Sequence, residues 1–157
     1  VESLEVHHEW LRQFPDDYAD QVKARIELGY QYSNEDYRHA IEMRKVYRQQ
    51  FVDQVFSHCD VMFIPTIQVH TPTIEASTRG SLEEVLKGVG RLTHVTKVMN
   101  YLGLPAVSLP GGFSDQEMPV GFQLVGRDFS EELILQIGHA YQTQTPWHQK
   151  MPPCATS

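Results

Sequence analysis

The segment TKVMNYLGLPAVSLPGG, residues 96–112, joins the end of one helix to the start of a strand. Its first part is predicted to close a helix over 91–102, which the run Gly103-Leu104-Pro105 terminates. Gly103 permits a positive φ at a helix end, and Pro105 fixes the backbone where a strand begins. The segment therefore predicts a helix that turns directly into a strand.

Two further strands are predicted on either side of this segment. Residues 106–109 form the first strand, 110–119 read as a turn region, and 120–126 form a strand that completes a hairpin. Upstream, the apolar run 61–64 ends at Pro65 and does not alternate with polar residues. Such a run favours a strand covered on both faces, as in a parallel or mixed sheet.

Helices account for most of the remaining chain. They are predicted over 4–13, from Asp16 or Asp17 to a helix-ending Gly29, and over 34–57, 81–88 and 131–143. Residues 33–36 resemble a capping signal and Ser130 is predicted to cap the last helix, whereas 66–80 read as a loop.

The inventory is five or six helices and about three strands, an α/β fold in which helices sandwich part of a mixed β-sheet. Residues 1–57 are expected to be helical, 58–143 to form the sheet core and 144–157 to form a tail of the same domain. Three strands leave two edges that need covering. The sequence therefore predicts one end of a larger sheet.

The composition is typical of a globular protein that neither binds nucleic acid nor spans a membrane. The 157 residues carry a formal net charge of −7 and are 41% hydrophobic, which is typical of a globular chain and argues against a nucleic-acid partner. No apolar run is long enough to predict a membrane span. Cys59 and Cys154 lie in unlike contexts, which favours a reducing compartment and a cytoplasmic location. A first residue other than Met indicates a piece cut from something longer.

The eight histidines do not form a metal motif. His7 and His8 are adjacent and face different sides of a helix, and the others have no partner at ligand spacing. Neither a metal nor a cofactor is expected.

Several polar and glycine positions have structural interpretations. Ser108 lies in a short strand without a visible base, and Gly121 leaves room for close approach of another group. Thr93, Thr96 and Asn100 share one helix face, which suits solvation or internal hydrogen bonding. The Asn100 amide is predicted to bridge the helix end and the following turn.

Three stretches, taken in order, resemble the C-terminal third of the amidase signature family. Residues 60–66 are similar to DvLltPT, 96–112 to T…N..G.PA.s.P.G, and 118–132 to GlPvGlQlvg..f.e. The matching motif positions include Pro65, Thr66, Gly103, Pro105, Ala106, Gly121 and Gln123. The resemblance covers about 30–143, departs from the family at Met118, and leaves 75–92 as a variable loop.

The resemblance implies hydrolysis of a linear amide by a Ser nucleophile, a bridging Ser held by a cis peptide, and a Lys base. In the family these groups and a Gly-rich oxyanion loop precede the C-terminal third. This chain has no Gly/Ser-rich segment, and none of its five lysines matches the base. It is therefore predicted to be an inactive C-terminal part of a larger amidase, in which Thr93, Thr96 and Asn100 form one wall of the acyl pocket.

Two alternatives remain open. The amidase-like subunit of an amidotransferase, which amidates a charged tRNA, uses the same machinery with ammonia delivered by a partner. The second alternative is a free-standing helical binding module without enzyme ancestry. Such a module would need neither the Asn-x-x-Gly-x-Pro-Ala run at 100–106 nor the Pro-Val-Gly-Phe-Gln run at 119–123. The implied partner is a small-molecule amide, with no nucleic acid or membrane, and the exposed sheet edge suggests self-association.

Overall fold

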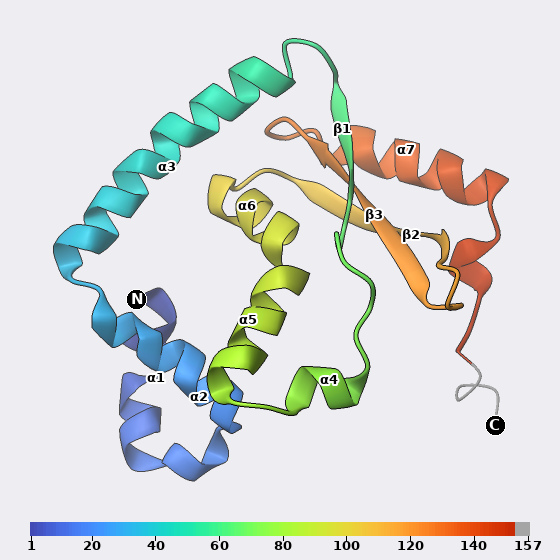
Figure 1. Cartoon of the computed structure of the whole chain (residues 1–157). Coiled ribbons are helices and arrows are strands. Elements are labelled where there is room, and N and C mark those ends of the chain that lie inside the picture. The colour runs from blue at the N-terminus through green and yellow to red at the C-terminus, as the bar shows by residue number, and fades with distance from the viewer. Residues whose placement is uncertain (153–157) are drawn as a thin grey trace. The chain divides into compact units, whose positions relative to one another are not determined.

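The computed structural model describes residues 1–152, so Cys154 and the end of the predicted tail lie outside the described residues. Figure 1 traces the helices and strands along the chain. The chain divides into two compact units. The helical unit comprises residues 1–46 with 73–90, and the sheet unit comprises 47–72 with 91–152. Within the described part, no helix is both long and apolar enough to cross a membrane.

The helical unit begins with helices and turns that bury Leu11, Ile26 and Gly29. Its first elements are α1 (Glu2–Gln13), a 3-10 turn (Pro15–Asp17), α2 (Asp20–Glu27) and a second 3-10 turn (Leu28–Gln31). The prediction that Asp16 or Asp17 caps the second helix is wrong, because Pro15–Asp17 form their own turn and Ala19 occupies the N-cap of α2.

Gly29 also differs from its predicted role. It lies inside the second 3-10 turn, and its φ is not among the positive values of the described glycines. A Cβ on Gly29 would lie 2.8 Å from Leu4 Cβ. This glycine is therefore required where α1 approaches the turn and not as a left-handed helix end.

Helix α3 (Asn34–Val55) starts with the predicted capping signal. The Ser33 N–H donates to Asp36 Oδ2 at 2.8 Å, and the Asp36 N–H donates to Ser33 Oγ at 3.1 Å. The Ser33 hydroxyl and N–H both stabilise the charged carboxylate, so they lower the pKa of Asp36. The capping prediction is confirmed, with Asp in the position usually held by Glu.

Two helices follow in the stretch 73–92. The short α4 (Ile74–Thr78) lies within the predicted loop, where the Ala76 N–H donates to Thr73 Oγ1 at 3.0 Å and starts a single helical turn. The next helix, α5 (Leu82–Leu92), has its own box, in which the Glu84 N–H donates to Ser81 Oγ at 3.3 Å. With α4 included, the described residues form seven α-helices, more than the five or six predicted.

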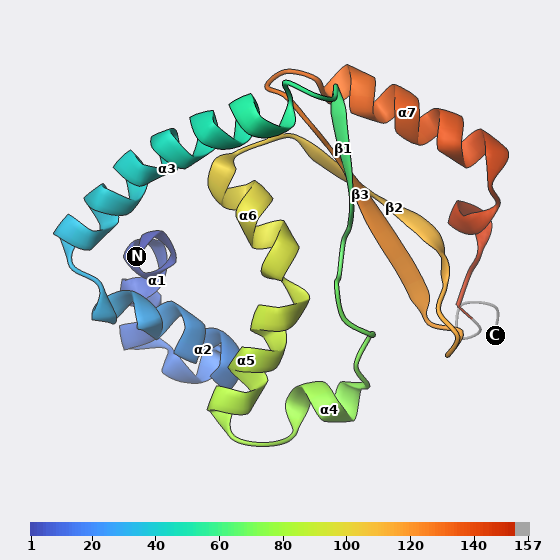
Figure 2. The same cartoon turned by 45° about the horizontal axis from the view of Figure 1, so that its top comes forward.

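The sheet unit contains three strands in the order β1-β3-β2 (Figure 2). They are β1 (Val61–Pro65), β2 (Ala106–Phe113) and β3 (Pro119–Gly126). Both pairs are antiparallel, so the hairpin prediction is confirmed, and no parallel pair occurs among the described strands. The central strand β3 places Gln123 opposite Ile64 on one side and Ser108 on the other.

Strand β2 is longer than predicted. The sequence assigns Pro110 and Gly112 to the turn, whereas the pairing with β3 continues to Phe113 through a bulge between these two residues. Pro110 is tolerated because β2 is an edge strand of the described sheet, and Gly112 adopts a φ of 128°. The turn itself is short, and the Ser114 N–H donates to the Met118 carbonyl at 2.8 Å.

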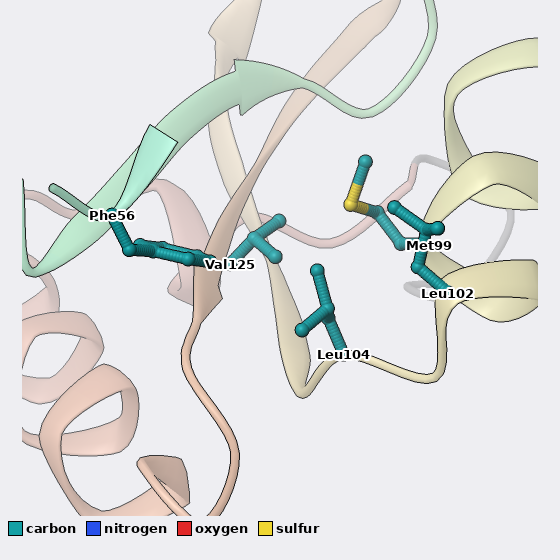
Figure 3. Packing of buried hydrophobic residues seen from close by; sticks show 5 residues of the cluster. All are labelled: Phe56, Met99, Leu102, Leu104 and Val125. Atoms are coloured by element: carbon teal, nitrogen blue, oxygen red, sulfur yellow. The ribbon is translucent and has the colours of Figure 1, made fainter. Parts of the chain in front are cut away.

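Helix α6 (His94–Leu102) and the end of α3 cover one face of the sheet. Gly103 follows α6 with φ 69° and ψ 37°, which confirms its predicted left-handed conformation. Figure 3 shows the hydrophobic cluster that results. Its buried members are Phe56, Met99, Leu102, Leu104 and Val125.

Helix α7 (Glu131–Gln144) contacts β2 and β3 and buries a second cluster. The buried members of that cluster are Leu109, Phe122, Leu124 and Ile134. Ser130 precedes the helix as predicted, but its hydroxyl donates to the Arg127 carbonyl at 2.7 Å and makes no side-chain cap. A 3-10 turn (Trp147–Gln149) follows within the predicted tail.

Candidate functional site

The three strands bring the three sequence motifs together. The Thr66 N–H, just beyond β1, donates to the Gly121 carbonyl of β3 at 3.0 Å, and Pro110 of β2 lies opposite Gly121. Two residues further along β3, Gln123 lies opposite Ser108. Thr66 and Ser108, which are 42 positions apart in sequence, therefore meet on one sheet face.

A pair of hydroxyl groups lies over Gly121. Thr66 Oγ1 and Ser108 Oγ are 2.8 Å apart, and a Cβ on Gly121 would lie 3.3 Å from Thr66 Oγ1. The prediction that Gly121 permits a close approach is confirmed. We call Thr66, Ser108 and Gln123 the polar strip, because they present hydrogen-bonding side chains on the same face.

Gln123 is the buried member of the polar strip. Its side chain is 4% exposed, and within residues 1–152 its Nε2 atom has no hydrogen-bond partner. A buried donor without a partner lowers the stability of the folded state by about 1–3 kcal/mol relative to a donor that is paired. The side chain of Gln123 therefore places an unpaired N–H donor in the largely apolar interior of the sheet unit.

An open cavity of about 650 Å³ adjoins the strip at Thr66 and Gly121. The loop 65–71 and residues 119–121 form most of its wall, and its remaining polar groups include Gln68, His70 and Ser114. Such a cavity has the size range of small-molecule sites.

The polar strip lacks the groups that serine chemistry needs. A nucleophilic hydroxyl requires an adjacent base. In the described residues, Thr66 and Ser108 share only the hydroxyl–hydroxyl bond, and no lysine side chain makes a hydrogen bond or ion pair. Lys23 is half-buried and the other four lysines are exposed. Among the described residues, no base therefore hydrogen-bonds to either hydroxyl.

The predicted pocket-wall residues lie at α6. Thr93 occupies the N-cap position, and the half-buried Thr96 donates its hydroxyl proton to the Thr93 carbonyl at 3.2 Å. Asn100 is exposed, and across the described part its amide makes no hydrogen bond. The predicted bridge from Asn100 to the following turn is therefore wrong. Instead, the Gly103 and Leu104 N–H groups both donate to the Met99 carbonyl.

The sequence does not predict how the turn between β3 and α7 is held. The guanidinium of Arg127 donates to the Phe56 carbonyl and lies 5.6 Å from the centre of the Phe56 ring, and Asp128 pairs with Arg48. Phe129 between these anchors has φ 58° and is 94% exposed. A positive φ in an aromatic residue is uncommon, and hydropathy patterns contain no signal for it.

The family description "Amidase" matches residues 3–135. Among curated relatives, an amidase named AmiD from Mycobacterium tuberculosis is 30% identical over 153 residues, which is 98% of this chain and 32% of the relative. A glutamyl-tRNA(Gln) amidotransferase subunit from Picosynechococcus is 36% identical over 140 residues, which is 86% of this chain and 28% of the relative. The chain thus spans about a third of the length of the relatives that it matches.

Solved structures show the same fold. A crystal structure of an amidase matches with a TM-score of 0.72 at 23% identity and covers 89% of this chain and 32% of that one. A 6-aminohexanoate cyclic dimer hydrolase matches with a TM-score of 0.73 at 22% identity, over 88% of this chain and 30% of that one. These arrangements of helices and strands therefore form a recurring portion of a longer fold.

Proposed function

Because the chain belongs to the amidase family, we propose that it forms the C-terminal part of an amidase that hydrolyses a linear carboxylic amide to an acid and ammonia or an amine. The family match over residues 3–135 carries this proposal. The polar strip has hydroxyl groups without a base, which supports a positioning role for this part of the protein.

The proposed chemistry takes place on residues that precede Val1 in a complete enzyme. A serine oxygen attacks the amide carbonyl carbon, and its proton passes through a second serine to a lysine. The amine leaves with a proton, and water then cleaves the acyl–serine ester. The role of this chain is to complete the sheet and to supply one wall of the acyl pocket through Thr93, Thr96 and Asn100.

Part of a tRNA-dependent amidotransferase is the second candidate. The 36% identity to a glutamyl-tRNA(Gln) amidotransferase subunit supports it directly. Such a protein would release ammonia from an amide donor and depend on a partner and a charged tRNA. Membership of the amidase family argues against a helical binding module without enzyme ancestry.

Release of ammonia or amine from a panel of linear amides tests the proposal. The chain of 157 residues alone is expected to show no turnover, whereas the protein extended by the coding sequence ahead of Val1 is expected to hydrolyse at least one amide. Serine-directed inhibitors should abolish that activity. Turnover by the short chain, or an inactive extended protein with or without charged tRNA, contradicts the proposal.

Amide hydrolysis in the absence of tRNA favours the amidase. Product formation that requires charged tRNA and a second protein chain favours the amidotransferase.

A further inference from the structure

The unpaired amide of Gln123 points to a missing hydrogen-bond acceptor. Its Nε2 atom is buried, and nothing in residues 1–152 accepts a hydrogen bond from it. Nearly all buried polar groups in folded proteins have a partner, so an exception needs an explanation. A methionine of similar length would fill the same volume without the unpaired donor, which makes the glutamine costly in this chain alone.

The neighbours of Gln123 do not supply that acceptor. Ile64 lies opposite it on β1 and offers no polar side-chain atom. Ser108 lies opposite it on β2, and its hydroxyl hydrogen-bonds to Thr66 Oγ1 at 2.8 Å and not to the Gln123 amide. Among the described residues, the Gln123 N–H therefore has no acceptor and is available to a group from outside them.

The β2 side of this face is open to such a group. Ala106 and Ser108 are exposed and small, and they lie on the same face as Gln123, because Ala106 faces Val125 and Ser108 faces Gln123 in the pairing with β3. Strand β2 also has no neighbour on its outer side among the described strands. Small side chains allow another backbone to come close.

The amide can turn toward that open side at low cost. The terminal torsion of glutamine is broad and roughly two-fold, so rotation about it needs little energy. Turning Nε2 toward Ser108 would bring its N–H to the exposed part of the face. A neutral carbonyl oxygen suits a neutral amide donor in an apolar layer, because it adds no buried charge.

We propose that an extended peptide segment from the remaining two thirds of the amidase fold crosses β2 over Ala106 and Ser108, and that one of its main-chain carbonyl oxygens accepts the free N–H of Gln123. The Thr66–Ser108 hydroxyl pair contacts the adjacent peptide group. This inference rests on the proposed function for the existence of that segment. The occupant is chosen because the matched relatives are about three times the length of this chain.

The test is the effect of Gln123→Met on stability in two proteins, the chain of 157 residues and the form extended ahead of Val1. In the chain alone, losing the unpaired donor should lower the unfolding equilibrium constant at least about threefold. In the extended protein, losing the new hydrogen bond should raise that constant about tenfold. Urea titrations followed by circular dichroism give both values.

The exposed Gln54 of α3 provides the matched control, since Gln54→Met should leave both constants within about twofold. Side-chain amide exchange measured by NMR is the second readout and needs no substitution. The Gln123 NH₂ group should exchange at least about tenfold more slowly in the extended protein than in the chain alone.

An effect of the same sign in both proteins, or equal exchange rates, overturns the proposal. A change of sign together with an extended protein that hydrolyses no amide refutes the proposed function and leaves this contact standing. A reading frame with no coding sequence ahead of Val1 would remove the occupant and overturn the inference.

Discussion

Gly126 shows how a single hydrogen atom in place of a side chain sets the packing of α7. A Cβ there would collide with Ser130 Oγ and lie 3.1 Å from Ile134 Cγ2. Gly126→Ala should therefore lower the free energy of unfolding by about 2 kcal/mol, because the helix must shift away from β3. Urea denaturation measures this loss.

Gly88 in α5 is the matched control for that substitution. No neighbouring atom lies within 4 Å of the position that a Cβ on Gly88 would take. Gly88→Ala should stabilise the chain by about 0.5–1 kcal/mol, since alanine favours a helix interior. Equal effects of the two substitutions would show that α7 does not pack closely on Gly126.

Asn100 offers a test of the proposed pocket wall at the residue scale. Its amide is exposed and unpaired within the described part, so it is available to a substrate. In the extended protein, Asn100→Ala should raise KM about tenfold through loss of one hydrogen bond. Steady-state kinetics on the best amide measure this change, with the exposed Lys87→Ala as control. An unchanged KM would remove Asn100 from the pocket.

At the scale of the element, the capping box of α3 makes helix stability depend on pH. The Ser33 hydroxyl and N–H lower the pKa of Asp36 below the ordinary carboxyl value near 4. The charged box therefore stabilises the folded state fully above about pH 4, and this contribution is lost as the pH falls through the lowered pKa.

Ser33→Ala should lower the free energy of unfolding by about 1 kcal/mol at neutral pH, because the cap is lost. It should also reduce the loss of stability between about pH 5 and 2. Urea titrations across this pH range, followed by helical circular dichroism, measure both effects. Ser57→Ala, beyond the end of α3, is the control, because the Ser57 hydroxyl donates to the Gln54 carbonyl at 3.4 Å and takes no part in the capping box. A pH profile unchanged by Ser33→Ala would contradict the box as the cause.

Long periodic elements could be predicted from the sequence, whereas short ones could not. Apolar spacing gave α3 and α7 to within two residues at each end. The single turn α4 depends on the Thr73 hydroxyl, and β2 continues past Pro110 because that proline lies on an edge strand. Both outcomes depend on local hydrogen bonding and strand order, which hydrophobic patterns do not contain.

For the candidate site, the roles of single residues could be predicted from the sequence, but the contacts between residues could not. Gly103 and Gly121 could be assigned structural roles because the absence of a Cβ has local consequences. The contact of Thr66 with Ser108 depends on the register of two strands against a third. The unpaired state of Gln123 is a property of the packed sheet and could not be inferred from its neighbours in sequence.

At the scale of the whole molecule, open strand edges favour self-association. Strands β1 and β2 each have one side without a described partner, and Phe63 on β1 is 66% exposed. The isolated chain should therefore show a mass above 18.0 kDa that rises with concentration in light scattering.

Phe63→Lys should reduce this association about tenfold by placing a charge at the edge. Ile74→Lys is the control, because Ile74 is 85% exposed but lies on α4 and outside the sheet. A monomer of 18.0 kDa at every concentration would mean that the edges do not pair.

The two tryptophans give each unit an optical reporter of its own. Trp10 on α1 is 60% exposed and lies near Phe14, whereas Trp147 packs edge-on against Phe113 at the end of β2. Trp10→Phe would leave an emission spectrum that follows the hairpin alone, and Trp147→Phe would leave one that follows the first helices. Melting curves of these two proteins would separate cooperative loss of the entire chain from stepwise loss of its halves.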